Sequence, residues 1–376
     1  MVKSRHSIAI ILAVLAALTA LLYLFLFRPY VALAYDGEAP GWFQSGLQAL
    51  YPRFEIEKQR FDLTFFQYKA DQVLIRILLS AAALIFLLLR YSIATIIRQY
   101  SIIHEEQHFR TLGKIFYAGL FLYSWDWYVD FSQIIIMGEF YKGIHLYSML
   151  GINLLTLEVY YLLFVVYLLS IVLTFAGIKP VFFSSSAALL LVFFQGYFYS
   201  FEKIDHGYTT LTYAAMLMPF LYYELKKQSG HSGSKASFVL FLIQFTIAGC
   251  YFLAGVEKLL TSGFQWASAE TFTTYIKLHQ QELGLWIIQY EILTHLLPLI
   301  ALIFQLCFIL IIFFPRYRCL FLLGGIGFHW GTRLLLGVGS FFSSWIFVYI
   351  FFLPWNSFLR KLRSISINIS RSQKGA

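Results

Sequence analysis

Charged residues are scarce in this sequence, at 12% of 376 residues, whereas soluble domains average about 25%. So few charges cannot cover a water-facing surface, and this excludes an ordinary soluble enzyme. A disordered chain is excluded too, because disordered segments contain few apolar residues and many charges.

Cysteine is also rare, with only Cys250, Cys307 and Cys319 present. Each lies inside or at the edge of an apolar run, no pair has metal-ligand spacing, and the number is odd. We therefore expect buried thiols, from which the redox compartment cannot be deduced.

The sequence contains no Walker motif, no Rossmann glycine pattern and no C-x-x-C pair. One segment, His104-Glu105-Glu106-Gln107-His108, does match the H-E-x-x-H pattern of zinc peptidases. A zinc site would also need a third ligand, and this segment lies in a polar gap between apolar runs. We therefore expect no metal site.

Apolar residues make up 60% of the chain and aromatic residues 20%, and the mean hydropathy is +0.71. A helix needs about 20 apolar residues to cross the hydrocarbon core of a bilayer. The sequence predicts an all-α fold, a polytopic transmembrane helical bundle of about ten spans. The candidate spans are residues 8–27, 73–89, 115–137, 147–175, 181–200, 207–223, 238–260, 284–314, 319–338 and 341–353.

The net charge of +9 is distributed in the short gaps between these runs. With both termini placed in the cytoplasm, 17 of the 28 Lys and Arg residues lie on the inner side, as the positive-inside rule requires. The basic residues therefore set orientation and do not form a nucleic-acid footprint. Membrane lipid is an expected partner, and nucleic acid is not.

Four parts of the chain follow from this pattern: an N-terminal transmembrane anchor (1–27), an extracytoplasmic interfacial segment (28–71), the main bundle (72–357) and a basic cytoplasmic tail (358–376). The alternative for the first span is a signal peptide, since Ala32-Leu33-Ala34 resembles a cleavage site. Its long apolar stretch favours a retained anchor.

Ionisable side chains in or beside the spans form a short list, and such residues usually face a cavity or a partner. They are Asp126, Asp130, Glu158, Glu202, Asp205, His206, Glu257, Lys258, Glu291, His295, His329 and Arg333. The topology places most of them near the outer ends of their spans. We therefore expect Glu291, His295, His329 and Arg333 to bind ligand in one outward-facing pocket, which His206 and Lys258 also line.

Each of these residues also has a structural interpretation. Lys258 can extend to the interface from an apolar stem, and His206 can be an ordinary loop histidine. Glu291 with His295, and His329 with Arg333, are each four residues apart and can be buried structural pairs.

The run from Tyr251 to Leu259, which reads Y-F-L-A-G-V-E-K-L, is followed by Trp266. It resembles the Y-F-x-A-G-x-x-K-L…W stretch of the vitamin K-dependent γ-carboxylase family and its bacterial HTTM-domain relatives. The segment from Phe328 to Pro354 is similar to a late histidine-bearing helix pair of that family. The resemblance covers the chain from the second span onward and implies an integral protein of the bacterial inner membrane.

The resemblance implies that Lys258 is the base that deprotonates a reduced quinone, a vitamin K-like hydroquinone, and that His206 assists. Desolvation beside an apolar cavity favours the neutral amine that a base requires. A secreted peptide is the implied substrate. The animal carboxylases carry a lumenal domain that this sequence does not match, and Glu257 replaces a basic residue. The resemblance therefore implies quinol-coupled oxidation or peptide modification rather than glutamate carboxylation itself.

Two other classes of function stay open. The chain is alternatively a peptide maturation, export or transport protein without redox chemistry, although internal repeats typical of transporters are not evident. A structural or signalling membrane subunit without chemistry is the third hypothesis.

Overall fold

The computed structural model describes residues 2–51, 54–90, 106–144, 146–201, 207–227 and 234–355. The structure is all-helical, and the residues that it describes contain no strand. This confirms the predicted all-α class. Two compact units are distinguished: residues 1–99, 137–155 and 195–204 form the first, and residues 100–136, 156–194 and 205–376 the second.

Five helical stretches are long and apolar enough to cross a membrane among the described ranges: Ala9–Asp36, Leu157–Phe175, Pro180–Tyr199, Lys235–Ala267 and Pro315–Leu336. A shorter apolar helix covers Glu291–Cys307. Together they indicate a membrane protein. The full count of ten spans and the cytoplasmic position of both termini stay predictions.

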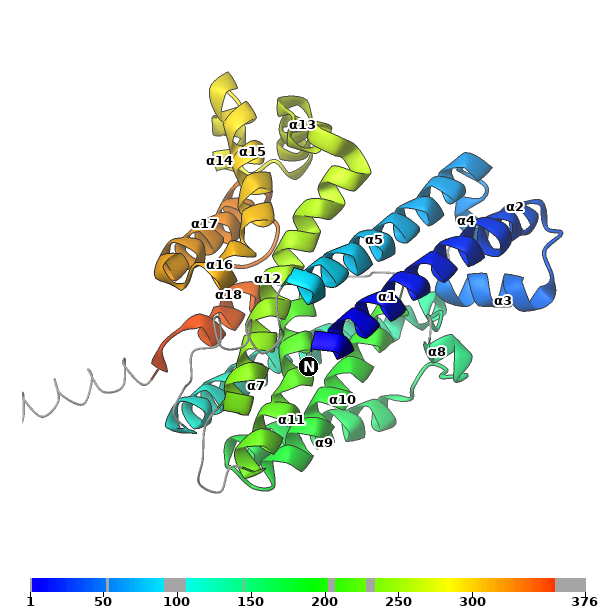
Figure 1. Cartoon of the computed structure of the whole chain (residues 1–376). Helices are drawn as coiled ribbons and strands as arrows, with labels where there is room; N and C mark the ends of the chain where they lie inside the picture. The colour runs from blue at the N-terminus through cyan, green and yellow to red at the C-terminus, as the bar shows by residue number, and fades with distance from the viewer. Residues whose placement is uncertain are drawn as a thin grey trace, which may run out of the picture. The chain divides into compact units, whose positions relative to one another are not determined.

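In the first unit, one long helical rod consists of α1 (Val2–Leu22), the π-helical turn η1 (Tyr23–Phe27) and α2 (Arg28–Asp36). The rod runs beside α5 (Leu63–Arg90), as Figure 1 shows. Tyr23 donates a hydrogen bond to Asp71 of α5, and Arg28 Nε lies 3.3 Å from the same carboxylate. The predicted boundaries at residues 27 and 71 therefore fall inside helices.

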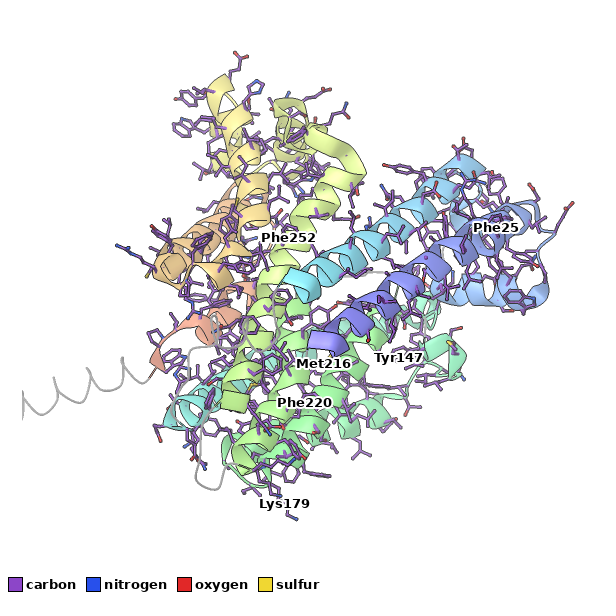
Figure 2. The ribbon with its side chains drawn as sticks, in the orientation of Figure 1. Phe25, Tyr147, Lys179, Met216, Phe220 and Phe252 are labelled. Carbon is purple, nitrogen blue, oxygen red and sulfur yellow. The ribbon has the colours of Figure 1, made fainter. Side chains whose placement is uncertain are left out.

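Two short helices, α3 (Gly41–Leu50) and α4 (Phe54–Glu57), connect the rod to α5. Phe43, Phe54 and Phe66 pack with Val31, Ala34 and Ala39 into a local apolar core. The 28–71 segment thus contains a local apolar core of its own. Phe25 of η1 points outward and is 78% exposed (Figure 2), as expected for a side chain that faces lipid.

The first unit also contains α8 (Leu146–Met149) and most of η2 (Ile135–Phe140). Lys142 N–H donates to the carbonyl of Ser200 over 2.7 Å, and Leu155 N–H donates to the Tyr197 hydroxyl over 2.8 Å. These bonds tie the 137–155 segment to the end of α10.

The second unit contains α7 (Glu106–Ile134), α9 (Leu157–Phe175), α10 (Pro180–Tyr199), α11 (Thr209–Lys227) and α12 (Ser234–Ser262), although the last turn of α10 belongs to the first unit. The most extensive helix pair is α11 with α12, which lie side by side in Figure 1. Met216 and Phe220 of α11, labelled in Figure 2, are 45% and 59% exposed. Their spacing of four residues gives α11 an exposed apolar stripe opposite its packed face.

The rest of this unit consists of two longer helices and several short elements: η3 (Gly263–Ala267), α13 (Ala269–His279), α14 (Glu282–Ile287), α15 (Glu291–Cys307), α16 (Leu310–Phe313), η4 (Pro315–Tyr317), α17 (Arg318–Leu336), α18 (Ser344–Phe347) and η5 (Val348–Phe352). α12 packs against α15, α16 and η5, and α17 packs against α13, α14, α15 and α18.

Three of the predicted spans differ from the structure. The 147–175 run consists of most of α8, an irregular connection at residues 150–156 and α9, which begins only at Leu157. The 284–314 run is divided among α14, α15 and α16, with breaks at residues 288–290 and 308–309, whereas α15 continues through Pro298. The 341–353 run forms only α18 and η5, which are too short to cross a bilayer. All five residues of η5 are buried, so high hydropathy here reflects packing inside the unit.

Candidate functional site

Tyr251 of α12 is the centre of a buried polar cluster in the second unit. Its hydroxyl lies 2.6 Å from Nε2 of His329 on α17 and 2.7 Å from the hydroxyl of Tyr349 on η5. Tyr251 is 1% exposed and Tyr349 is 4% exposed. A phenol both donates and accepts, so Tyr251 links the imidazole and the second phenol in one hydrogen-bonded chain. We call these three residues the Tyr–His–Tyr cluster.

Aromatic rings surround the Tyr–His–Tyr cluster. The ring centroid of Tyr251 lies 4.2 Å from that of Phe308 and 5.0 Å from that of Trp345, and Phe304 lies within 6.0 Å. Trp345 also lies 6.0 Å from the ring of His329. Such a wall shields the buried Tyr251 hydroxyl from water, and a hydrogen bond in this low-dielectric setting is electrostatically stronger than one in water.

Gly325 explains how η5 approaches α17 closely enough to complete the cluster. It lies one helical turn before His329, and a Cβ atom at this position would overlap the hydroxyl of Tyr349. A side chain larger than hydrogen would push Tyr349 away from Tyr251.

Lys258 lies on the same face of α12 as Tyr251, since seven residues correspond to two turns. The rise between them is roughly 10 Å along the helix axis. Its ammonium lies 4.8 Å above the ring centroid of Trp266 on η3, and Nζ is 3.5 Å from the carbonyl of Ala254. Lys258 is half-buried. The predicted catalytic lysine and the tryptophan of the same motif are therefore in contact.

Glu257, beside Lys258, is exposed, and its carboxylate accepts a hydrogen bond from Thr261 over 3.1 Å. Adjacent residues of a helix point about 100° apart. Glu257 thus projects away from the face that carries Tyr251 and Lys258.

The remaining predicted binding residues do not join this face. Glu291 and His295 of α15 are exposed, whereas Thr294, Pro298, Leu302 and Gln305 form the buried side of that helix. Within the described ranges, no hydrogen bond or ion pair connects Glu291 or His295 to Lys258 or His329. The reason is rotational, because His295 lies one residue, about 100°, away from the packed position of Thr294.

Arg333 is exposed as well, and it donates to the carbonyl of Gly337 over 2.8 Å. It lies one turn beyond His329 but points toward the end of α17. Among the predicted pocket residues that the structure describes, only Lys258, on this face of α12, and His329, which contacts Tyr251 on the same face, are therefore associated with one another.

Several predicted residues lie outside the part of the chain that the structure describes. They are His206, Glu202 and Asp205, together with His104 and Glu105 of the H-E-x-x-H match. Among the described residues, no three His, Cys, Asp or Glu side chains come together in a group suited to a metal ion.

Sequence reasoning missed Tyr251 and Tyr349 as members of the site. Tyr251 belongs to the motif but lies among apolar residues, and Tyr349 lies in the apolar 341–353 run. A signal was present, because a buried phenol usually finds a hydrogen-bond partner. Pairing that rule with His329 would have pointed to the cluster.

Comparisons with protein-family models, with curated proteins and with solved structures find no match to this chain.

Proposed function

We propose that this chain is a membrane-embedded enzyme that binds a reduced quinone-type ligand and couples its oxidation to modification of a secreted peptide. The observation that carries the proposal is the placement of Lys258 on the same α12 face as the Tyr–His–Tyr cluster. One helix face thus offers an amine, a phenol and, through the phenol, an imidazole.

The residues fit the chemistry of a quinone-type ligand. Trp266 and Trp345 offer flat aromatic surfaces near Lys258 and His329, respectively. The phenols and the imidazole can donate to or accept from ring oxygens. When bound, a reduced quinone supplies an acidic phenolic O–H and two electrons.

Lys258 serves as the base in this proposal. Its neutral Nζ takes up the phenolic proton, and the Trp266 ring stabilises the ammonium that results through a cation–π interaction. The Tyr–His–Tyr cluster would position the ring oxygen atoms of the ligand and can hold a proton at Nε2 of His329. Dioxygen would accept the two electrons, and the aromatic wall would shield the reacting atoms from bulk water and its protons.

A second function, peptide export or transport without redox chemistry, is favoured by one observation. The α14–α15–α16 segment is a discontinuous helix, and interrupted helices are typical of transporter binding sites. Under this hypothesis Lys258 lines a path, and its charge rather than its basicity matters.

Quinol oxidation by the protein in nanodiscs separates the two functions. Reduced naphthoquinone is added, and oxygen consumption is measured for wild type, Lys258→Ala and Lys258→Arg. A general base contributes roughly 10²- to 10⁴-fold, so both variants should lose at least 10²-fold.

The matched control is Lys277→Ala on α13, which removes an exposed lysine and should leave the rate unchanged. Full oxidation by a folded Lys258→Arg variant would refute the base assignment, because a guanidinium does not deprotonate near neutral pH. Peptide uptake into proteoliposomes by that variant, without quinol oxidation by wild type, would establish the transport function instead.

A further inference from the structure

The loop of residues 337–343 joins α17 to α18 and directly follows a helix that is long and apolar enough to cross a membrane. Gly337 ends this helix with φ of 66°. The loop therefore begins where a span leaves the hydrocarbon core.

Three large side chains of this loop are apolar and exposed. Val338 is 50% exposed, Phe341 is 42% exposed and Phe342 is 82% exposed. The loop reads G-V-G-S-F-F-S and contains no charge. Surface loops in water are typically polar, so this composition indicates a different environment.

The backbone carbonyls of the same loop are occupied by side chains from neighbouring helices. Arg333 donates to Gly337 O over 2.8 Å, and Trp330 Nε1 donates to Phe341 O over 3.0 Å. The Tyr123 hydroxyl of α7 donates to Phe342 O over 2.6 Å. In lipid, an unsatisfied backbone group costs several kcal/mol, so irregular backbone there needs internal partners. In water these carbonyls would be solvated without help.

Two glycines set the shape of the loop. Gly337 and Gly339 have φ of 66° and 80°, a left-handed conformation that costs other residues about 1–2 kcal/mol. Together with the three side-chain donors, they hold the exposed phenylalanines in a defined position.

We propose that the loop of residues 337–343 inserts Val338, Phe341 and Phe342 into the bilayer at the boundary between headgroups and acyl chains. Trp330, which is 45% exposed, lies one turn before Arg333 and suits the aromatic belt at the same depth. Arg333 is exposed and has further guanidinium donors for a lipid phosphate. The continuity with a candidate span and the satisfied carbonyls favour lipid over a protein partner.

Photocrosslinking in native membranes tests this proposal on the full chain. The photoreactive residue p-benzoylphenylalanine replaces Phe342 in one variant and Gln280 in a control, which lies exposed in the polar turn between α13 and α14. After irradiation and purification, intact mass spectrometry identifies the adduct. We expect a phospholipid adduct at position 342, with a yield several-fold above that at position 280.

A protein adduct at position 342, or a lipid yield no greater than that at position 280, would overturn the proposal. If the variant at position 342 does not elute as a folded protein, the same residue is placed at Val338. A lipid adduct there supports the proposal, and a protein adduct or none contradicts it.

Discussion

The hydroxyl oxygens of Tyr251 and Tyr349 lie 2.7 Å apart, although the residues are 98 positions apart in the sequence. His329 completes the cluster from a third element, with Nε2 2.6 Å from Tyr251. The central phenol therefore holds α12, α17 and η5 together with two hydrogen bonds.

Replacing Tyr251 with Phe should destabilise the protein by about 1–3 kcal/mol, because two polar partners lose their hydrogen bond inside an aromatic wall. Thermal unfolding in detergent measures the effect. Tyr275→Phe on α13 is the control, because Tyr275 is 50% exposed; its change should stay within about 0.5 kcal/mol. Equal unfolding temperatures for Tyr251→Phe and wild type would show that the bonds contribute nothing.

Two glycines of α17 provide a matched pair for the packing argument. Gly325→Ala places a methyl group against the buried hydroxyl of Tyr349, and we expect a loss of about 1–3 kcal/mol from overpacking. Gly327→Ala meets no atom within 4 Å and should gain roughly 0.5–1 kcal/mol, because alanine favours a helix interior. The unfolding temperatures of the two variants are compared with that of wild type. A Gly325→Ala variant as stable as wild type would contradict the close contact between Gly325 and Tyr349.

Much of the helical content was predictable from the sequence, because uninterrupted apolar runs of about twenty residues favour membrane-spanning helices. α10, α12 and α17 correspond closely to such runs, and α9 covers the last 19 residues of the predicted 147–175 run. Hydropathy does not distinguish lipid from protein surroundings, however. The 341–353 run is apolar because η5 is buried in the second unit, and the aromatic residues of the predicted interfacial segment 28–71 contribute to a local core.

The candidate site was only partly predictable. Lys258 and Trp266 shared a motif and do lie in contact, whereas Glu291 and His295 required knowledge of how α15 is rotated. Depth along a span can be estimated from sequence position, but the direction of a side chain depends on which face packs. The two hydrogen-bond partners of Tyr251, His329 and Tyr349, lie 78 and 98 residues away in the sequence. No local sequence pattern specifies such distant contacts.

We expect the stability of the protein to depend on the ionisation of Asp62, at the start of α5, in acid. Its carboxylate accepts hydrogen bonds from the Thr64 hydroxyl over 2.7 Å and from Phe65 N–H over 3.1 Å, and these bonds lower the pKa of Asp62. Because the pKa is lower in the folded state, the ionised carboxylate of Asp62 stabilises the fold fully above the ordinary carboxyl pKa. This stabilisation is lost as the pH falls through the pKa of Asp62 in the folded state.

The unfolding temperature of wild type should thus fall more steeply below about pH 4 than that of Asp62→Asn, whose amide caps the helix without titrating. Parallel pH profiles for the two proteins would show that Asp62 is not coupled to folding.

The contact between Lys258 and Trp266 should appear as an energetic coupling. A double-mutant cycle with Lys258→Met and Trp266→Leu measures it from unfolding temperatures. We expect about 0.5–2 kcal/mol, the range for a cation–π pair from exposed to desolvated settings. Additive single-mutant effects would mean that the two side chains do not interact.

The most direct test of the proposed function is organic extraction of the purified protein followed by mass spectrometry, with wild type beside Lys258→Ala and Tyr251→Phe. The account predicts a quinone-type molecule in stoichiometric amount with wild type and less with both variants. A well-folded wild-type protein that yields no such molecule, and that does not bind added reduced naphthoquinone, would contradict it.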